Sequence, residues 1–222
     1  MATLTPKYIT FDCYGTLTHF QMSNMARDML KGRVPADKMD AFVRDFGGYR
    51  FDEVLGAWKP YREVISNALA RTCKRWGIAF KPAEAEAFYL AVPTWGPNPD
   101  VPAPLAKVAK KIPLVILSNA ANDQIQSNVA LLGAPFHAVY TAESARAYKP
   151  RMQAFEFMFD SLGCTPADVL HVSSSLRYDL ITANLMGVGA RAFVKRGHDQ
   201  PNPLWGYTEI PDLGGLPALV GL

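Results

Sequence analysis

The stretch "KYITFDCYGT" at residues 7–16 places a short apolar run directly before an acidic residue. The β-branched and aromatic residues of this run predict a short buried strand over residues 8–12. In an open parallel sheet, Asp12 then stands at the carboxyl end of its strand, where such sheets bind their ligands. Tyr14 follows two residues later and adds an aromatic hydroxyl to the same turn.

The composition is that of a globular protein with a substantial core. The chain has 222 residues, of which 49% are hydrophobic and 19% charged, enough for one large domain or for a core with a smaller insertion. The net charge is only +3, and no run of five like charges occurs, so the sequence offers neither a nucleic-acid arm nor a basic membrane patch. We therefore expect no nucleic-acid partner.

Cysteine usage and hydropathy bear on the compartment. The three cysteines fit neither a zinc pattern nor a disulfide framework. The N-terminal residues lack a long apolar segment typical of signal peptides, and no run of about 18 apolar residues predicts a membrane helix. We expect a cytoplasmic protein without membrane attachment.

Two patterns of hydrophobic periodicity divide the chain. Helical spacing dominates residues 18–94, with helices expected over residues 23–32 (begun by a Ser23 cap), 35–48 (ended by a glycine pair), 60–77 and 81–95. Beyond that block, strand and helix patterns alternate four times, which indicates a parallel sheet with crossover helices. We predict an α/β fold: a doubly wound, Rossmann-like core of residues 1–17 and 95–222 with an inserted helical cap domain of residues 18–94. The Pro/Gly-rich tail predicts a short closing helix at most.

Polar residues follow the predicted strands in order. They are Asp12, then Ser118 and Asn119, then Lys149, then three serines and Asp179. Each has an ordinary alternative: Asp12, Ser118 and Asn119 as caps, Lys149 as a solvated loop charge, and Asp179 as an acid in the first turn of a helix. Their appearance together at strand ends favours a common site.

Four motifs resemble those of the haloacid dehalogenase superfamily, and together they span most of the chain. They are "FDCYGT", "ILSN", "YKP" and "SSSLRYD". The resemblance implies that Asp12 is a nucleophile. Phosphatases of this superfamily carry a second acid two residues after the nucleophile, and here Tyr14 takes that position. The sequence is therefore similar to the L-2-haloacid dehalogenase branch.

That resemblance implies hydrolysis of short 2-haloacids to 2-hydroxy acids with inversion, through an ester on Asp12 and without metal or cofactor. Lys149 and Asp179 are expected to organise the nucleophile and the water, and Thr16 and Ser174 to support the nucleophile. Tyr14, Arg44, Tyr61, Ser118 and Asn119 are the expected substrate- and halide-binding residues, with Arg50 as the alternative to Arg44. Fluoroacetate is among the conceivable substrates.

Two departures from the branch stand out, because Phe155 replaces a common tyrosine and Leu176 replaces an asparagine. Each removes a hydrogen bond near Lys149 and Asp179. His171 is interpreted as a neutral structural histidine and Cys13 as a buried filler. Two other functions stay open: a magnesium-dependent phosphatase of the same superfamily, or an idle relative that binds a small acid or a partner protein. A homodimer is also left open.

Overall fold

The computed structural model describes residues 5–222, which form two compact units. One unit, the core, contains the described residues up to His19 and again from Gly96 onward. The other, the cap, is Phe20–Trp95. These boundaries lie within two residues of those expected from the sequence.

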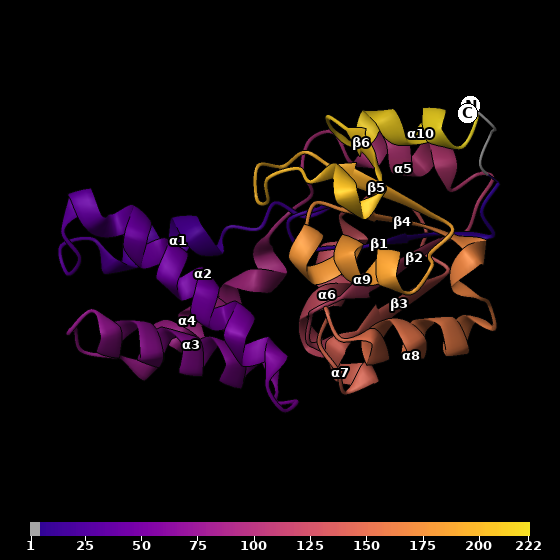
Figure 1. The fold of residues 1–222 in the computed structure, drawn as a ribbon. Helices are drawn as coiled ribbons and strands as arrows, with labels where there is room; N and C mark the ends of the chain where they lie inside the picture. The colour runs from indigo at the N-terminus through magenta and orange to yellow at the C-terminus, as the bar shows by residue number, and fades with distance from the viewer. Residues whose placement is uncertain (1–4) are drawn as a thin grey trace. The chain divides into compact units, whose positions relative to one another are not determined.

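The core is built on a sheet of six parallel strands in the order β3-β2-β1-β4-β5-β6 (Figure 1), so the predicted α/β fold is confirmed. The first strand of the chain lies inside the sheet, between β2 and β4. The strands are β1 (Tyr8–Phe11), β2 (Leu114–Ser118), β3 (Ala138–Thr141), β4 (Val169–Ser173), β5 (Ala190–Val194) and β6 (Thr208–Ile210).

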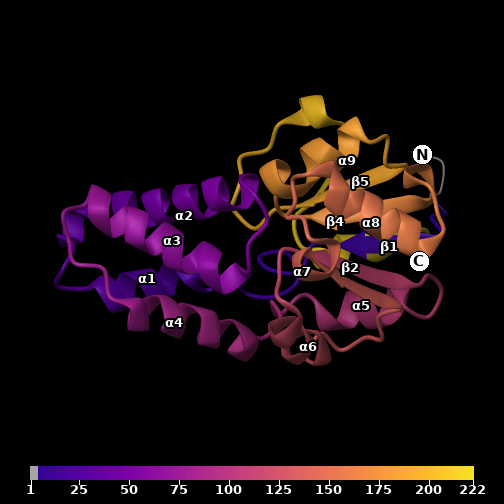
Figure 2. The same ribbon diagram turned by 90° about the horizontal axis from the view of Figure 1, so that it is seen from below.

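Helices cover both faces of this sheet (Figures 1 and 2). Buried side chains of α5 (Pro102–Val108), α6 (Asn122–Ala130) and α10 (Leu216–Leu219) join one core cluster with side chains of β1, β2 and β4. Those of α8 (Met152–Leu162) and α9 (Ile181–Leu185) join a second cluster. A short helix, α7 (Ala142–Ala145), leads into the loop that carries Lys149. Burial on both faces explains why β2 reads as an unbroken apolar run.

Strand register brings the carboxyl ends of the central strands together. Ile9 of β1 pairs with Leu114 on one side and with Leu170 on the other. The chain then leaves β1 at Asp12, whose N–H donates to the Val172 carbonyl at 3.1 Å. Asp12, Ser118 and the serines after β4 therefore share one edge of the sheet.

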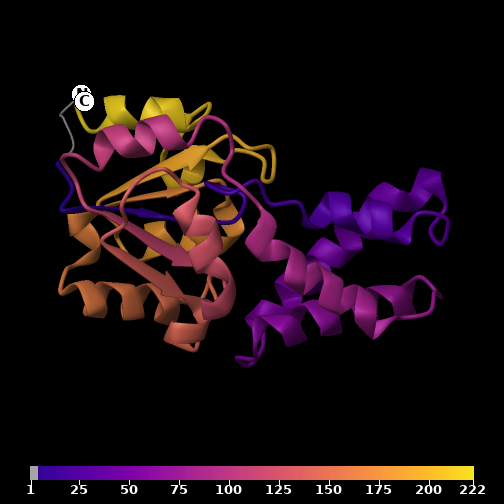
Figure 3. The same ribbon diagram turned by 180° about the vertical axis from the view of Figure 1, so that it is seen from behind.

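The cap contains four α-helices, whose ribbons are seen from behind in Figure 3. They are α1 (Met22–Leu30), α2 (Met39–Leu55), α3 (Tyr61–Arg75) and α4 (Pro82–Ala91). The rings of Phe46 and Phe88 join α2 to α4, with their centroids 5.3 Å apart. No helix within residues 5–222 is long and apolar enough to cross a membrane.

Three expectations about local structure were wrong. Helix α2 continues through Gly47 and Gly48 to Leu55, because buried side chains before and after the glycines keep one face packed and outweigh the cost of a helical glycine, about 1 kcal/mol. Helix α1 begins after Gln21 rather than after a Ser23 cap. The tail adds a sixth strand, β6, which is too short to show a sequence pattern but buries Ile210.

A close backbone approach beside β5 gives a stability test. A Cβ on Gly189 would lie 2.2 Å from the Ala167 carbonyl oxygen, which is backbone and must move. We expect Gly189→Ala to lower the free energy of unfolding by roughly 1–3 kcal/mol. The control is Gly48→Ala in α2, which has open space and should be neutral or stabilising. Urea denaturation measures both, and equal stability of the two variants would contradict the predicted crowding.

Candidate active site

The turn after β1 holds the Asp12 carboxylate in a defined orientation. Gly15 adopts a φ of +92°, which L-residues rarely reach, and this allows the tight reversal. The Thr16 hydroxyl then donates to Asp12 Oδ2 at 2.7 Å and accepts from the Ser174 N–H at 2.9 Å. Asp12 is only 8% exposed. Thr16 and the Ser174 backbone thus support the predicted nucleophile through a direct chain of contacts.

Lys149 joins the two acids. Its side chain is fully buried, and Nζ lies 2.9 Å from Asp12 Oδ1, 2.7 Å from Asp179 Oδ1 and 2.8 Å from the Leu117 carbonyl oxygen. An ammonium group has three hydrogens, so these three acceptors use all of them. The solvated alternative for Lys149 is therefore excluded.

Asn119 fixes the backbone that carries this lysine. Its Oδ1 accepts from the Lys149 N–H at 2.8 Å, and its Nδ2 donates to the Lys149 carbonyl at 2.9 Å. This two-point contact holds the lysine loop against the end of β2. The predicted halide contact of Asn119 stays a prediction, but the residue has a structural task that the motif alone did not reveal.

Asp179 is completely buried and receives donors from three directions. Besides Lys149, the Ser173 hydroxyl donates to Oδ2 at 3.0 Å, and His171 Nε2 lies 3.0 Å from Oδ1. Asp179 sits in a wide, π-helical turn, Leu176–Leu180, rather than at the start of a regular helix. Asp199 caps that turn by accepting from the Leu176 N–H at 2.8 Å.

The electrostatics of the three charged groups differ. Burial raises the pKa of the Asp12 carboxyl, and the nearby charge of Asp179 adds to this, although Lys149 and Thr16 act in the opposite direction. Burial also opposes ionisation of Asp179, but Lys149 and His171 outweigh it and lower that pKa. The two carboxylates outweigh burial at Lys149 and raise its pKa. The lysine therefore stays charged and favours ionisation of both acids, but burial outweighs its effect at Asp12 and not at Asp179.

Cys13 lies beside the nucleophile but cannot compete with it. Burial raises the pKa of its thiol to about 12, so the thiolate is absent at neutral pH. Its Sγ lies 3.5 Å from the Thr18 hydroxyl, inside the core cluster. These contacts agree with the interpretation of Cys13 as a buried filler.

Ser118 and Tyr14 occupy different environments at the same sheet edge. The Ser118 hydroxyl is buried and has no hydrogen-bond partner among the described residues. Since buried polar groups are normally paired, this hydroxyl is suited to a ligand. Tyr14 instead donates its hydroxyl to Asn128 Oδ1 of α6 at 2.9 Å. Its predicted substrate contact stays a prediction.

The predicted cap residues do not all lie together. Tyr61 is buried at the start of α3, and its pKa is raised by burial, with the neighbouring Arg50 acting to lower it. The Arg50 guanidinium lies over the rings of Phe20 and Phe46, at 5.4 and 5.1 Å from their centroids. Arg44 is exposed on α2. The structure therefore brings Tyr61 together with Arg50, not with Arg44.

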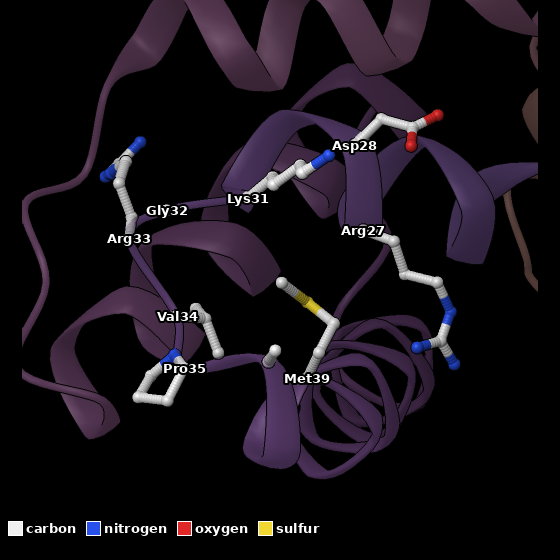
Figure 4. Close-up of a pocket in the computed structure, with 9 residues that line it drawn as sticks. Arg27, Asp28, Lys31, Gly32, Arg33, Val34, Pro35 and Met39 are labelled. Atoms are coloured by element: carbon white, nitrogen blue, oxygen red, sulfur yellow. The ribbon is translucent and has the colours of Figure 1, made fainter.

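A pocket of about 620 Å³ lies in the cap between α1 and α2 (Figure 4). Val34 and Met39 form part of its lining, and three basic side chains surround it. Two of those are already paired, because Arg27 contacts Asp40 and Arg33 contacts Glu84. None of the residues lining this pocket belongs to the predicted site. In the described part of the chain, no three His, Cys, Asp or Glu side chains gather as a metal site would require.

Comparison with known proteins identifies the family. The model of the haloacid dehalogenase-like hydrolases matches residues 6–187. The chain belongs to this family. It is 30% identical to an (S)-2-haloacid dehalogenase of Xanthobacter autotrophicus over 76% of this chain and 68% of that protein. It is 27% identical to haloacetate dehalogenase H-2 of Moraxella sp. (strain B) over 75% and 76% of the two chains.

A solved structure agrees with these relatives. The L-2-haloacid dehalogenase of Xanthobacter autotrophicus with chloropropionic acid covalently bound superimposes with a TM-score of 0.77 at 26% identity. The match covers 97% of this chain and 98% of the other. The likeness therefore extends over both the core and the cap of this hydrolase.

Replacing Lys149 should destabilise the fold, because the two buried acids then lack a counter-charge. We expect Lys149→Met to lower the free energy of unfolding at pH 8 by about 3–5 kcal/mol, because two buried carboxylates lose their cation. Their pKa values then rise in the folded state, which binds more protons than the unfolded state, so stability falls as pH increases. The deficit should therefore be smaller at pH 5. Urea denaturation at both pH values measures it.

The exposed Lys111→Met is the matched control and should change stability little at either pH. A Lys149→Met deficit that is the same at pH 5 and pH 8 would show that the acids are not what the lysine stabilises.

Proposed function

We propose that this hydrolase removes halide from short 2-haloalkanoic acids and replaces it with hydroxide. The main observation behind this proposal is that the Lys149 ammonium lies between the two acids, with Nζ 2.9 Å from Asp12 Oδ1 and 2.7 Å from Asp179 Oδ1. This arrangement supplies a nucleophilic carboxylate, a second fixed acid and a buried positive charge at one edge of the sheet. The similarity to enzymes named as 2-haloacid and haloacetate dehalogenases supports the same reaction here.

In the first half-reaction, one oxygen of Asp12 attacks the carbon that bears the halogen. A carbon–oxygen bond forms on the side opposite the leaving group, the carbon–halogen bond breaks, and halide departs with the electron pair. Carboxylates are weak nucleophiles, so alignment and partial desolvation must supply much of the rate. The raised pKa of Asp12 and its low exposure agree with a desolvated nucleophile.

In the second half-reaction, water attacks the Asp12 Cγ of the resulting ester. The bond between Cγ and the substrate oxygen breaks, the 2-hydroxy acid leaves, and the Asp12 carboxylate is regenerated. One proton of the water goes to the departing oxygen and the other is released overall. The configuration was inverted in the first step and is retained in this one. Asp179 and Lys149 organise this water and the ester.

No metal ion is required for this scheme. Lys149 already places a positive charge between the two acids, where a magnesium-dependent enzyme would use the cation. Tyr14 is a poor substitute for the second acid of a phosphatase, because a phenol is a much weaker acid than a carboxylic acid.

An anionic substrate needs donors, because the two acids and one lysine leave the buried cluster with an excess negative charge. Neutral donors avoid adding a further buried charge. The unpaired Ser118 hydroxyl is one such donor for the substrate carboxylate. We assign it that role, together with backbone N–H groups after Asp12.

The decisive experiment measures halide release from chloroacetate, bromoacetate, fluoroacetate and both enantiomers of 2-chloropropionate in the presence of EDTA. We expect release from at least the chloro and bromo acids, and its loss in Asp12→Asn, which keeps the shape of the carboxylate but not its nucleophilicity. The fluoroacetate result decides whether the site also cleaves the stronger carbon–fluorine bond.

Folded protein that releases no halide from any of these acids would refute the proposal. Hydrolysis of a phosphoester with magnesium would then favour the phosphatase, and ligand binding without turnover in a thermal-shift screen would favour the idle relative.

The donor for the departing halide is a cap arginine in this proposal, and the pairing of Arg50 with Tyr61 favours Arg50 over Arg44. We expect Arg50→Met to lower kcat/KM for 2-chloropropionate roughly 10- to 100-fold, since a lost charged donor costs about 1.5–3 kcal/mol. The exposed Arg44→Met is the matched control and should stay within about twofold of the wild type. A larger loss of kcat/KM in Arg44→Met than in Arg50→Met would instead assign the halide contact to Arg44.

A further inference from the structure

His171 is a buried titratable residue that the proposed reaction does not use. It lies on β4, completely inaccessible to solvent, with its ring between β1 and the turn that carries Asp179. Its Nδ1 is 2.8 Å from the Thr10 hydroxyl, and its Nε2 is 3.0 Å from Asp179 Oδ1. Both ring nitrogens therefore have a buried polar partner.

The contacts select one tautomer of the neutral ring. Asp179 Oδ1 is a carboxylate oxygen and can only accept, so His171 meets it with Nε2–H, while Nδ1 faces the Thr10 hydroxyl at 2.8 Å. Nδ1 then accepts, and Nε2 carries the hydrogen that is donated to Asp179. Thr10 and His171 are register partners in the β1–β4 pair, so the sheet itself holds this contact in place.

A second contact fixes the ring plane. Phe155 of α8 packs edge-to-face against the His171 ring, with centroids 5.4 Å apart and an interplanar angle of 69°. The imidazole is thus held by a hydrogen bond at each nitrogen and by an aromatic neighbour. A ring fixed in this way can impose its own orientation on the carboxylate that it contacts.

The consequence concerns the ester stage of the reaction. When Asp12 is esterified it loses its negative charge, and Asp179 becomes the only anion in contact with Lys149. The position of the ammonium then depends on how firmly Asp179 is held. Asp179 Oδ1 accepts from both Lys149 and His171, and Oδ2 accepts from Ser173. His171 Nε2–H is therefore the second donor to Asp179 Oδ1, the oxygen that also accepts from Lys149.

We propose that His171 is a positioning residue for hydrolysis of the aspartyl ester: its Nε2–H fixes Asp179, and through it Lys149, after Asp12 has been esterified. This inference rests on the proposed dehalogenation. It adds a Thr10–His171–Asp179 chain, of which only the last residue was expected to take part in the reaction. These three residues affect the second half-reaction more than the first. Until Asp12 is esterified, it also binds Lys149, so the position of the lysine depends less on Asp179.

Two substitutions separate hydrogen bonding from packing. His171→Phe keeps a flat ring beside Phe155 but has no donor, whereas His171→Gln keeps an amide N–H near the position of Nε2. With chloroacetate, we expect His171→Phe to lower kcat roughly 10- to 100-fold. Substrate binding and the rate of the first halide displacement should change little. Halide should appear as a burst of about one equivalent per active site, followed by slow turnover.

Intact-protein mass spectrometry should show the carboxymethyl ester accumulating in His171→Phe and not in the wild type. His171→Gln should recover most of kcat and remove the burst. Wild-type kcat in His171→Phe, or equal losses in the Phe and Gln variants without a burst, would overturn the proposal.

A third variant keeps the test decisive if His171→Phe does not fold. Thr10→Val removes the hydroxyl that contacts Nδ1, and Thr10→Ser retains it as the control. We expect a smaller fall in kcat with the same burst for Thr10→Val, and near wild-type turnover for Thr10→Ser. Unchanged kinetics in Thr10→Val would count against the chain.

Nitrogen-15 labelling of histidine in the wild-type protein separates this proposal from the function on which it rests. Protonated Nε2 and unprotonated Nδ1 at His171 are expected. Halide turnover with the reverse tautomer would overturn the His171 proposal alone. The expected tautomer in a protein that releases no halide would refute the dehalogenase function, and with it the role of His171 in an ester step.

Discussion

The ammonium of Lys149, shared between two carboxylates and a backbone carbonyl, is the interaction on which the site depends. Burying an isolated charge in a protein core is costly, and each of these three groups is buried. The ammonium and the two carboxylates therefore stabilise one another. The parallel sheet makes the cluster possible, because β1 and β4 are neighbours and end at the same edge, and the loop after α7 brings the lysine to them.

This cluster also constrains substrate recognition. Two acids and one lysine leave a net negative charge, so an anionic substrate must be bound by neutral donors or by a cation from elsewhere in the chain. In the proposed function, the unpaired hydroxyl of Ser118 is the neutral donor for the substrate carboxylate, and Arg50 or Arg44 is the cation for the departing halide. The unequal pKa shifts have a purpose in this scheme. Lys149 and His171 lower the pKa of Asp179 and so favour its anion, whereas burial raises the pKa of Asp12, as the proposal of a desolvated nucleophile requires.

The sequence predicted the architecture because its signals are local and repeated. Apolar strands that alternate with helices define a parallel sheet, and a helical block between the first strand and the rest defines an insertion. The strand-end positions of Asp12, Lys149 and Asp179 followed from this order. Strand β6 was missed because three residues with one buried side chain carry no period. The glycine pair in α2 was wrongly predicted to end the helix, because packing of the buried side chains around it outweighs the low helix propensity of glycine.

The partners of the site residues could not be predicted for a different reason. Thr10 and His171 are 161 residues apart in the chain, and only the register of β1 with β4 brings them together. The sequence showed two lost hydrogen bonds, at Phe155 and Leu176, but not their replacement. In the structure, Phe155 packs edge-to-face against the ring of His171, whose Nε2 lies 3.0 Å from Asp179 Oδ1. A buried carboxylate needs a sufficient number of fixed donors, and the fold can supply them from a strand that is distant in the sequence. The missing tyrosine is therefore not evidence of an impaired site, because the constraint acts on the carboxylate and not on the identity of its donor.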